Sequence, residues 1–178
     1  PWQALLTHYE DGLSLDELVN FAERLEGSLK QASSRSAALT WAGLRAVDDD
    51  DMEADRLFRR ASEVCPDDVV PLWLLLQRGA YEDSTEQAQL LENLAGRVAD
   101  KSQAAQLFYD AGVIREQTLV DRERALSDFH SALLAEPAFQ PAADRVEQIL
   151  IGQNRLEELL DLNTARAEST QDPKLKAE

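Results

Sequence analysis

The sequence repeats a set of small, aromatic and proline positions at a fixed distance. The positions are Ala54, Phe58, Ala61 and Pro66 in one stretch and, 71 residues later, Ala125, Phe129, Ala132 and Pro137. Halfway between them, Ala88 and Ala95 stand 34 residues after Ala54 and Ala61, and the next step is 37 residues. Such a period indicates that similar structural units follow one another and that no unit buries its apolar face alone.

Apolar residues at helical spacing continue from Leu15 almost to the end of the chain, with short interruptions. Helices are expected over residues 15–25, 35–47, 52–65, 71–81, 85–99, 102–118, 123–136, 140–152 and 155–168. Ser14 with Glu17, and Ser84 with Gln87, have the spacing of capping boxes at helix starts. Asp121 is expected to cap the helix that follows it.

The composition favours helices over strands. Hydrophobic residues make up 44% of the chain, mostly as Leu and Ala, and only 7 Gly and 6 Pro interrupt it. Helices this short must stack in pairs, and short connections make neighbours antiparallel. We therefore expect an all-α fold.

The repeated positions resemble the second helix of the tetratricopeptide repeat (TPR). A period near 34 with A-x3-F, then Ala, then Pro is typical of that helix. The resemblance implies a helical-repeat solenoid, a right-handed superhelix of antiparallel helix pairs. The middle unit departs from the pattern, with Glu92 where Phe would stand and Asp100 where Pro would stand. An irregular helical bundle is the alternative fold.

The resemblance also implies a division of the chain. Residues 1–34 are expected to form a degenerate helical unit, and residues 35–168 to form repeats at about 35–68, 69–105, 106–139 and 140–168. Residues 169–178 are expected to be a tail or the start of a further repeat. The chain begins with Pro1 rather than Met, so we expect it to be a fragment of a longer protein. The three extra residues of the 37-residue step are expected near residues 118–122, as a flexible loop.

The charge of the chain restricts its partners. Its 34 acidic and 18 basic residues give a formal net charge of −16, without a Lys/Arg-rich block. Binding to nucleic acid or to an anionic membrane needs such basic surface, so neither is expected. No stretch is long and apolar enough for membrane insertion. With Cys65 as the single cysteine, we expect a cytoplasmic protein, or a periplasmic one if a signal peptide was removed.

No pattern indicates an active site, a cofactor or a bound metal. His8 and His130 are far apart in sequence, and Cys65 is expected to be a structural thiol. The four aspartates of residues 48–51 lack the spacing of a calcium loop, and a helix cap in a polar turn explains them better. We therefore expect no enzyme.

The TPR resemblance implies that first helices of successive units line a concave groove for a peptide or a partner helix. The groove candidates are Leu39, Arg45, Trp73, Gln77, Arg78, Asp110, Ile114, Arg115 and Gln117. Trp73 is the strongest of them, because exposed tryptophans often dominate interfaces, although a core position is the alternative. Arg45, Arg78 and Arg115 recur at steps of 33 and 37 residues. They are expected to form either a ladder that meets an acidic partner or ion pairs within the chain.

The predicted function is that of a non-catalytic protein–protein interaction scaffold or adaptor. The resemblance to long bacterial TPR scaffolds implies a role in an envelope, polarity or motility assembly, with a partner such as a peptide, a helix or a small GTPase. Two alternatives stay open. The chain could be a structural spacer that self-associates, or a regulatory segment of a larger enzyme.

Overall fold

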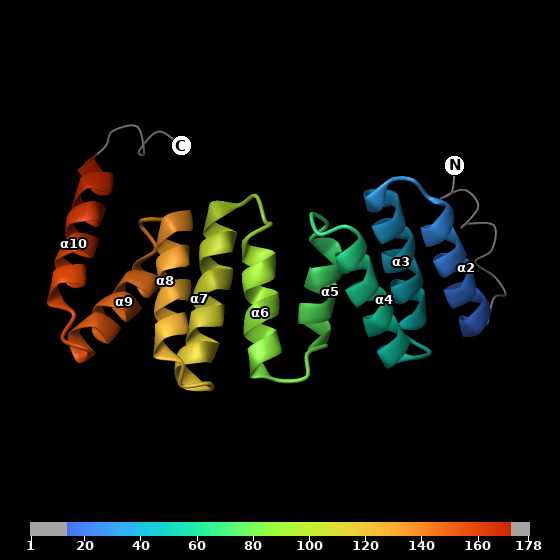
Figure 1. Cartoon of the computed structure of the whole chain (residues 1–178), viewed down its shortest axis with the longest axis horizontal. Coiled ribbons are helices and arrows are strands. Elements are labelled where there is room, and N and C mark those ends of the chain that lie inside the picture. Colours follow the sequence, from blue (N-terminus) through green and yellow to red (C-terminus); the bar gives the residue numbers. More distant parts are fainter. Residues whose placement is uncertain (1–13, 172–178) are drawn as a thin grey trace. The chain divides into compact units, whose positions relative to one another are not determined.

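The computed structural model describes residues 14–171 of the 178-residue chain, and their side chains through residue 165. These residues form helices and no strand, which confirms the all-α prediction. The helices are α2 (Leu15–Ser28), α3 (Ala32–Ala46), α4 (Asp51–Val64), α5 (Val70–Arg78), α6 (Ser84–Ala95), α7 (Lys101–Gln117), α8 (Arg122–Ala135), α9 (Gln140–Gly152) and α10 (Leu156–Gln171) (Figure 1). None of these helices is long and apolar enough to cross a membrane.

The chain divides into two compact units between Ala80 and Tyr81. The N-terminal unit contains α2 to α5 and the C-terminal unit contains α6 to α10. The boundary falls inside residues 69–105, which the sequence predicts as one repeat. Within each unit, every helix packs against the next one along the chain.

The same close contact holds one helix pair together in each unit. A Cβ atom added to Gly43 of α3 would lie 2.5 Å from Cε1 of Phe58 in α4. In the C-terminal unit, a Cβ atom added to Gly112 of α7 would also lie 2.5 Å from Cε1 of Phe129 in α8. Both rings are fully buried. The repeated phenylalanines therefore fill the space that a glycine on the preceding helix leaves open.

Helix starts follow the expected capping chemistry, with one correction. At α2, Glu17 N donates to Ser14 Oγ and Ser14 N donates to Glu17 Oε2, so this capping box is confirmed. The predicted box at Ser84 is wrong, because Asp83 caps α6 by accepting from the backbone N–H groups of Thr85 and Glu86. An aspartate one residue earlier satisfies the free N–H groups that Ser84 was expected to satisfy.

The aspartates that the sequence placed in turns also act as caps. Asp50, in the four-aspartate turn, accepts from the backbone N–H groups of Met52 and Glu53. Asp121 accepts from the N–H of Arg124, as expected. The interpretation of residues 48–51 as a capped polar turn is therefore confirmed.

The turn between α7 and α8, residues 118–121, is no longer than the turn between α3 and α4, residues 47–50, so the three extra residues do not lengthen it as expected. Thr118 N donates to Ile114 O and Asp121 N donates to Arg115 O, and Val120 has a positive φ of 56°. A β-branched residue rarely adopts this conformation. The turn thus has a defined backbone path from α7 into α8.

Candidate functional site

The groove candidates of the N-terminal unit occupy different environments. Leu39 has 0% exposed surface, because α3 packs against both α2 and α4. Its prediction as a groove residue is therefore wrong, and Leu39 belongs to the core. Trp73 is half-buried, whereas Arg45 and Gln77 are exposed. These three side chains have surface available to a partner.

The candidates of the C-terminal unit lie on α7. Gln117 is exposed and Ile114 is half-buried. Asp110 is half-buried and accepts a hydrogen bond of 2.8 Å from Gln106 Nε2. Burial raises the pKa of the Asp110 carboxyl, and the bond from Gln106 offsets this only in part. Arg115 is only 6% exposed, so the structure contradicts its role in an open groove.

Arg78 and Arg115 form ion pairs within the chain at the same sequence separation. Arg78 Nε donates to Asp55 Oδ1 at 2.7 Å, and Arg115 Nη2 donates to Glu92 Oε2 at 2.6 Å. In each case the carboxylate lies 23 residues earlier, on the helix before the arginine's own: Asp55 on α4 and Glu92 on α6. Arg78 also pairs with Asp51 at 2.6 Å. For these two arginines, the alternative of ion pairs within the chain is confirmed. The residue 23 positions before Arg45 is Ala22, so the 23-residue spacing is not repeated at that arginine.

Arg115 makes a second, buried contact that Arg78 does not make. Its Nη1 donates to Asp128 Oδ2, on α8, and Asp128 is 2% exposed. Burial, followed by a hydrogen bond with Glu92, raises the pKa of Asp128 to about 7, although Arg115 acts to lower it. The hydrogen bond from Arg115 lowers the pKa of Glu92. One guanidinium thus joins α6, α7 and α8 through two carboxylates.

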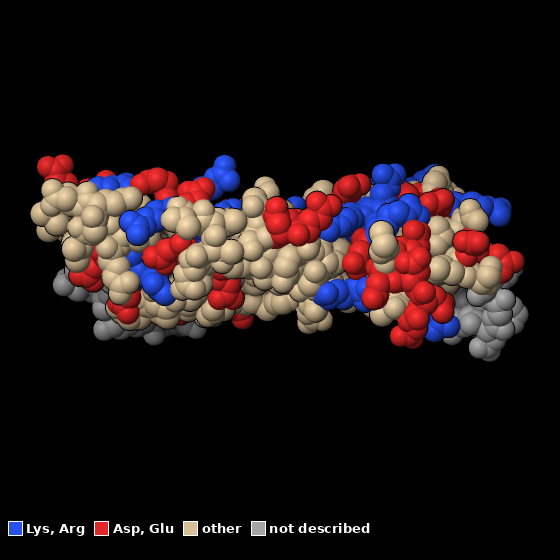
Figure 2. Space-filling model, turned by 90° about the horizontal axis from the view of Figure 1, so that it is seen from below, with Lys and Arg blue, Asp and Glu red and all other residues tan. Residues whose placement is uncertain are grey.

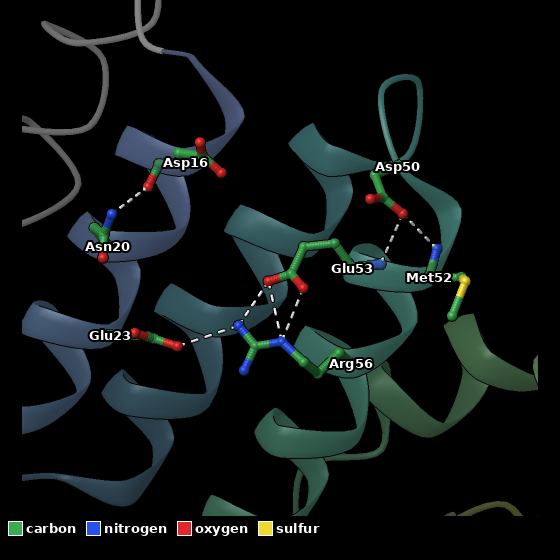
Figure 3. Close-up of polar contacts among 7 residues, drawn as sticks. All are labelled: Asp16, Asn20, Glu23, Asp50, Met52, Glu53 and Arg56. Atoms are coloured by element: carbon green, nitrogen blue, oxygen red, sulfur yellow. Dashed lines mark hydrogen bonds and ion pairs between the residues drawn. The ribbon is translucent and has the colours of Figure 1, made fainter.

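In the N-terminal unit, Arg56 of α4 joins α4 to α2 on the surface. Figure 3 shows its guanidinium between Glu53 and Glu23, which it contacts at 2.6 Å and 3.1 Å. Arg60, one turn later, lies 3.2 Å from Glu26. The hydrogen bond with Glu53 is the main cause that raises the pKa of Arg56. The pairs Arg56–Glu23 and Arg60–Glu26 therefore link α4 to α2, which are not consecutive helices.

Acidic side chains also gather on the N-terminal unit in the face that Figure 2 shows. Asp48, Asp49, Asp50 and Asp51 are all exposed between α3 and the first turn of α4. Within residues 14–165, no group of three or more His, Cys, Asp or Glu side chains could hold a metal ion. In this cluster Asp50 caps α4, and Asp51 pairs with Arg78.

The C-terminal unit has an apolar groove between α8 and α10, called here the α8–α10 groove, with a volume of about 490 Å³. It is lined by His130, Leu133, Leu134 and Pro137 from α8 and the turn after it, and by Glu158, Asp161, Leu162 and Ala165 from α10. Leu134 is 85% exposed at the edge of the groove. His130 is half-buried, and burial lowers the pKa of its imidazole. His8 lies outside the described residues.

Sequence reasoning missed the Arg115 contacts and the α8–α10 groove. The position of Glu92, where the repeat pattern has Phe, was the available signal for the first. For the α8–α10 groove, the signal was the position of Leu134 in the sequence of α8. Its spacing from the repeated Ala and Phe residues places Leu134 on a different side of the helix from them.

No protein-family model and no curated protein matches this chain at a significant level of similarity.

Proposed function

We propose that this chain is a non-catalytic, TPR-like module that binds a protein partner through the exposed side of its first helices. The observation that carries this proposal is the glycine–phenylalanine contact that recurs between α3 and α4 and between α7 and α8. Repeat proteins stack such pairs and use the surface of one helix of each pair for binding. Helix pairs joined in this way would form a TPR-like solenoid.

The proposal names one surface in each unit: Trp73 and Gln77 on α5 in the N-terminal unit, and Ile114 and Gln117 on α7 in the C-terminal unit. Trp73 and Ile114 are half-buried, so each offers an apolar contact that is already held in place by its own unit. A preformed surface loses little conformational entropy on binding, and aromatic anchors often supply much of the affinity. Gln77 and Gln117 are exposed and can exchange hydrogen bonds with the partner.

The proposed partner is a protein segment or a small folded domain, of which a small GTPase is one example. A scaffold in a bacterial envelope, polarity or motility assembly would use such a surface to recruit its partner. The net charge of −16 favours partners with basic surface, because complementary charge accelerates association. A spacer that self-associates and a regulatory segment of an enzyme remain the alternatives.

Site-specific photo-crosslinking in cells that make the full protein tests the proposal. A crosslinking amino acid at Gln77 or Gln117 should capture one defined protein, to be identified by mass spectrometry. The same amino acid at Met52, which is 82% exposed on α4, is the matched control and should not capture it. Trp73→Ala should weaken the capture at Gln77.

Two outcomes would contradict the proposal. Capture from Met52 alone would place binding on the second helices rather than the first. Capture of a second copy of the chain, and of nothing else, would favour the self-association alternative. Circular dichroism of each purified variant checks that its helices are intact.

A further inference from the structure

We propose that the α8–α10 groove binds a basic amphipathic helix of a partner protein. The proposal concerns second helices and is independent of the first-helix surface proposed above. Its starting point is the regular spacing of the lining residues. In α8 and the turn after it they stand at residues 130, 133, 134 and 137, and on α10 at residues 158, 161, 162 and 165. The α10 wall thus follows the i, i+3, i+4, i+7 pattern of one helix face, and the α8 wall follows the first three positions of that pattern before the turn.

The apolar part of the groove can hold hydrophobic anchors. Leu133 and Leu162 form its inner part: Leu133 belongs to the buried core cluster of the unit, and Leu162 packs against that cluster. Leu134 and Pro137 are exposed at its edge, and Ala165 is exposed on the α10 side. Because two facing rows of small and aliphatic residues match the ridge of an amphipathic helix, the shape fits helix-in-groove recognition.

The charge of the groove selects the partner. Its two charged lining residues are the carboxylates Glu158 and Asp161, and no Lys or Arg lines it among the described residues. Arg155 binds both oxygens of Glu158 at 2.7 Å, from the side of the preceding turn. Asp161 is exposed and has no ion-pair partner among the residues described. Lysine or arginine on the flank of the bound helix would therefore meet Asp161 first.

The same charges oppose the other occupants. A second copy would bring its own Glu158 and Asp161 towards the first pair, and each chain carries a net charge of −16. An anionic lipid surface or a nucleic acid would be repelled in the same way. A partner helix with basic flanks gains both the apolar contact and the opposite charge.

The test uses a fluorescein-labelled peptide of about 16 residues, made of Leu and Lys with Leu at i, i+3, i+4 and i+7. Fluorescence anisotropy measures its affinity for the protein, and light scattering measures the mass of the protein alone. The wild-type chain should bind the peptide as a monomer. Leu134→Glu and Asp161→Lys should each weaken binding about tenfold or more. Both changed side chains are exposed, so the fold should persist.

Matched variants separate the groove from general charge attraction. Glu147→Lys is the control for Asp161→Lys: it makes the same change of charge at an exposed residue of α9. Met52→Glu is the control for Leu134→Glu, because Met52 and Leu134 are similarly exposed. Both should bind within about twofold of the wild type. Amide NMR shifts should change near residues 130–137 and 158–165 when peptide is added.

Four results would overturn the proposal. They are no binding by the wild type, an equal loss with Glu147→Lys, equal binding of a peptide with every Leu replaced by Ser, or a dimer that Leu134→Glu dissociates. The last result would make the groove a self-association surface. None of these results bears on Gln77 or Gln117, so the two proposals fail separately.

Discussion

Gly112 lies directly against the ring of Phe129, and a Cβ atom at position 112 would come within 2.5 Å of the ring carbon Cε1. Gly43 and Phe58 stand in the same relation in the other unit. A real Cβ atom cannot approach a ring carbon this closely, so any larger residue must displace the ring or separate the helices. The two glycines therefore fix how closely the helices of each pair approach.

Replacing either glycine with alanine should destabilise its unit. Alanine gains up to about 1 kcal/mol of helix propensity over glycine. Overpacking against a fully buried ring costs about 1–3 kcal/mol or more, and we expect this cost to exceed the gain. Urea unfolding of Gly43→Ala and Gly112→Ala, followed by circular dichroism, measures the net change in the free energy of unfolding.

Gly27→Ala is the control for this prediction. Gly27 lies inside α2, and an added Cβ atom would meet nothing within 4 Å. This variant should be as stable as the wild type or more stable by up to about 1 kcal/mol. If Gly112→Ala behaved like Gly27→Ala, α7 and α8 could separate without cost, and the contact would not define the pair.

Removing Arg115 should cost more stability than removing Arg78, although both pair with a carboxylate 23 residues earlier. Arg115→Met leaves Asp128 buried without its cation, and breaking a buried pair in this way costs about 3–5 kcal/mol. Both carboxylate partners of Arg78 are more exposed than Asp128, so Arg78→Met should lower the free energy of unfolding by about 1 kcal/mol. Hydrogen exchange, read by mass spectrometry on peptides from α4–α5 and α7–α8, measures each unit separately. Equal losses would mean that the Asp128 contact adds nothing.

Asp128 should make stability depend on pH. Its pKa is about 7 in the folded chain and about 4 in the unfolded chain. The folded state therefore binds the proton of Asp128 more tightly than the unfolded state does. The contribution of Asp128 to the free energy of unfolding is complete below pH 4 and is lost as the pH rises to about 7. Asp128→Asn keeps a neutral side chain at this position and should remove this loss.

The pH dependence of wild type is compared with that of Asp128→Asn because other groups also titrate in this pH range. The pKa of Glu92 is lowered, so its contribution is lost only as the solution becomes acidic. Burial lowers the pKa of His130, which reduces stability as the pH falls through about 6.5. Urea midpoints from pH 5 to pH 8 should differ between wild type and Asp128→Asn by an amount that changes with pH. Parallel curves would show that Asp128 is ionised throughout.

The helices can be predicted from the sequence because they depend on local features, such as the spacing of apolar residues and the capping residues. The spacing of Phe58 and Phe129 predicts second helices, and the capping pattern at Ser14 predicts the start of α2. Leu39 was placed wrongly because the TPR register assigns first-helix residues outward, whereas α3 is covered on both sides. The surroundings of Arg115 could not be predicted, because Glu92 and Asp128 come from two other helices. The burial of Arg115 and Asp128 beside Glu92 depends on packing that no local pattern encodes.

The link between α2 and α4 should depend little on its surface charges. Glu23 and Arg56 are about half exposed, with 49% and 52% of their side-chain surfaces accessible. A double-mutant cycle of Glu23→Ala and Arg56→Ala should give a coupling below about 1 kcal/mol, falling further in about 1 M NaCl. Leu18 of α2, which is only 8% exposed, should matter more, and Leu18→Ala should cost about 2–5 kcal/mol. A coupling that exceeds the loss from Leu18→Ala, or that persists in salt, would mean that the charges rather than the apolar contact hold α2 in place.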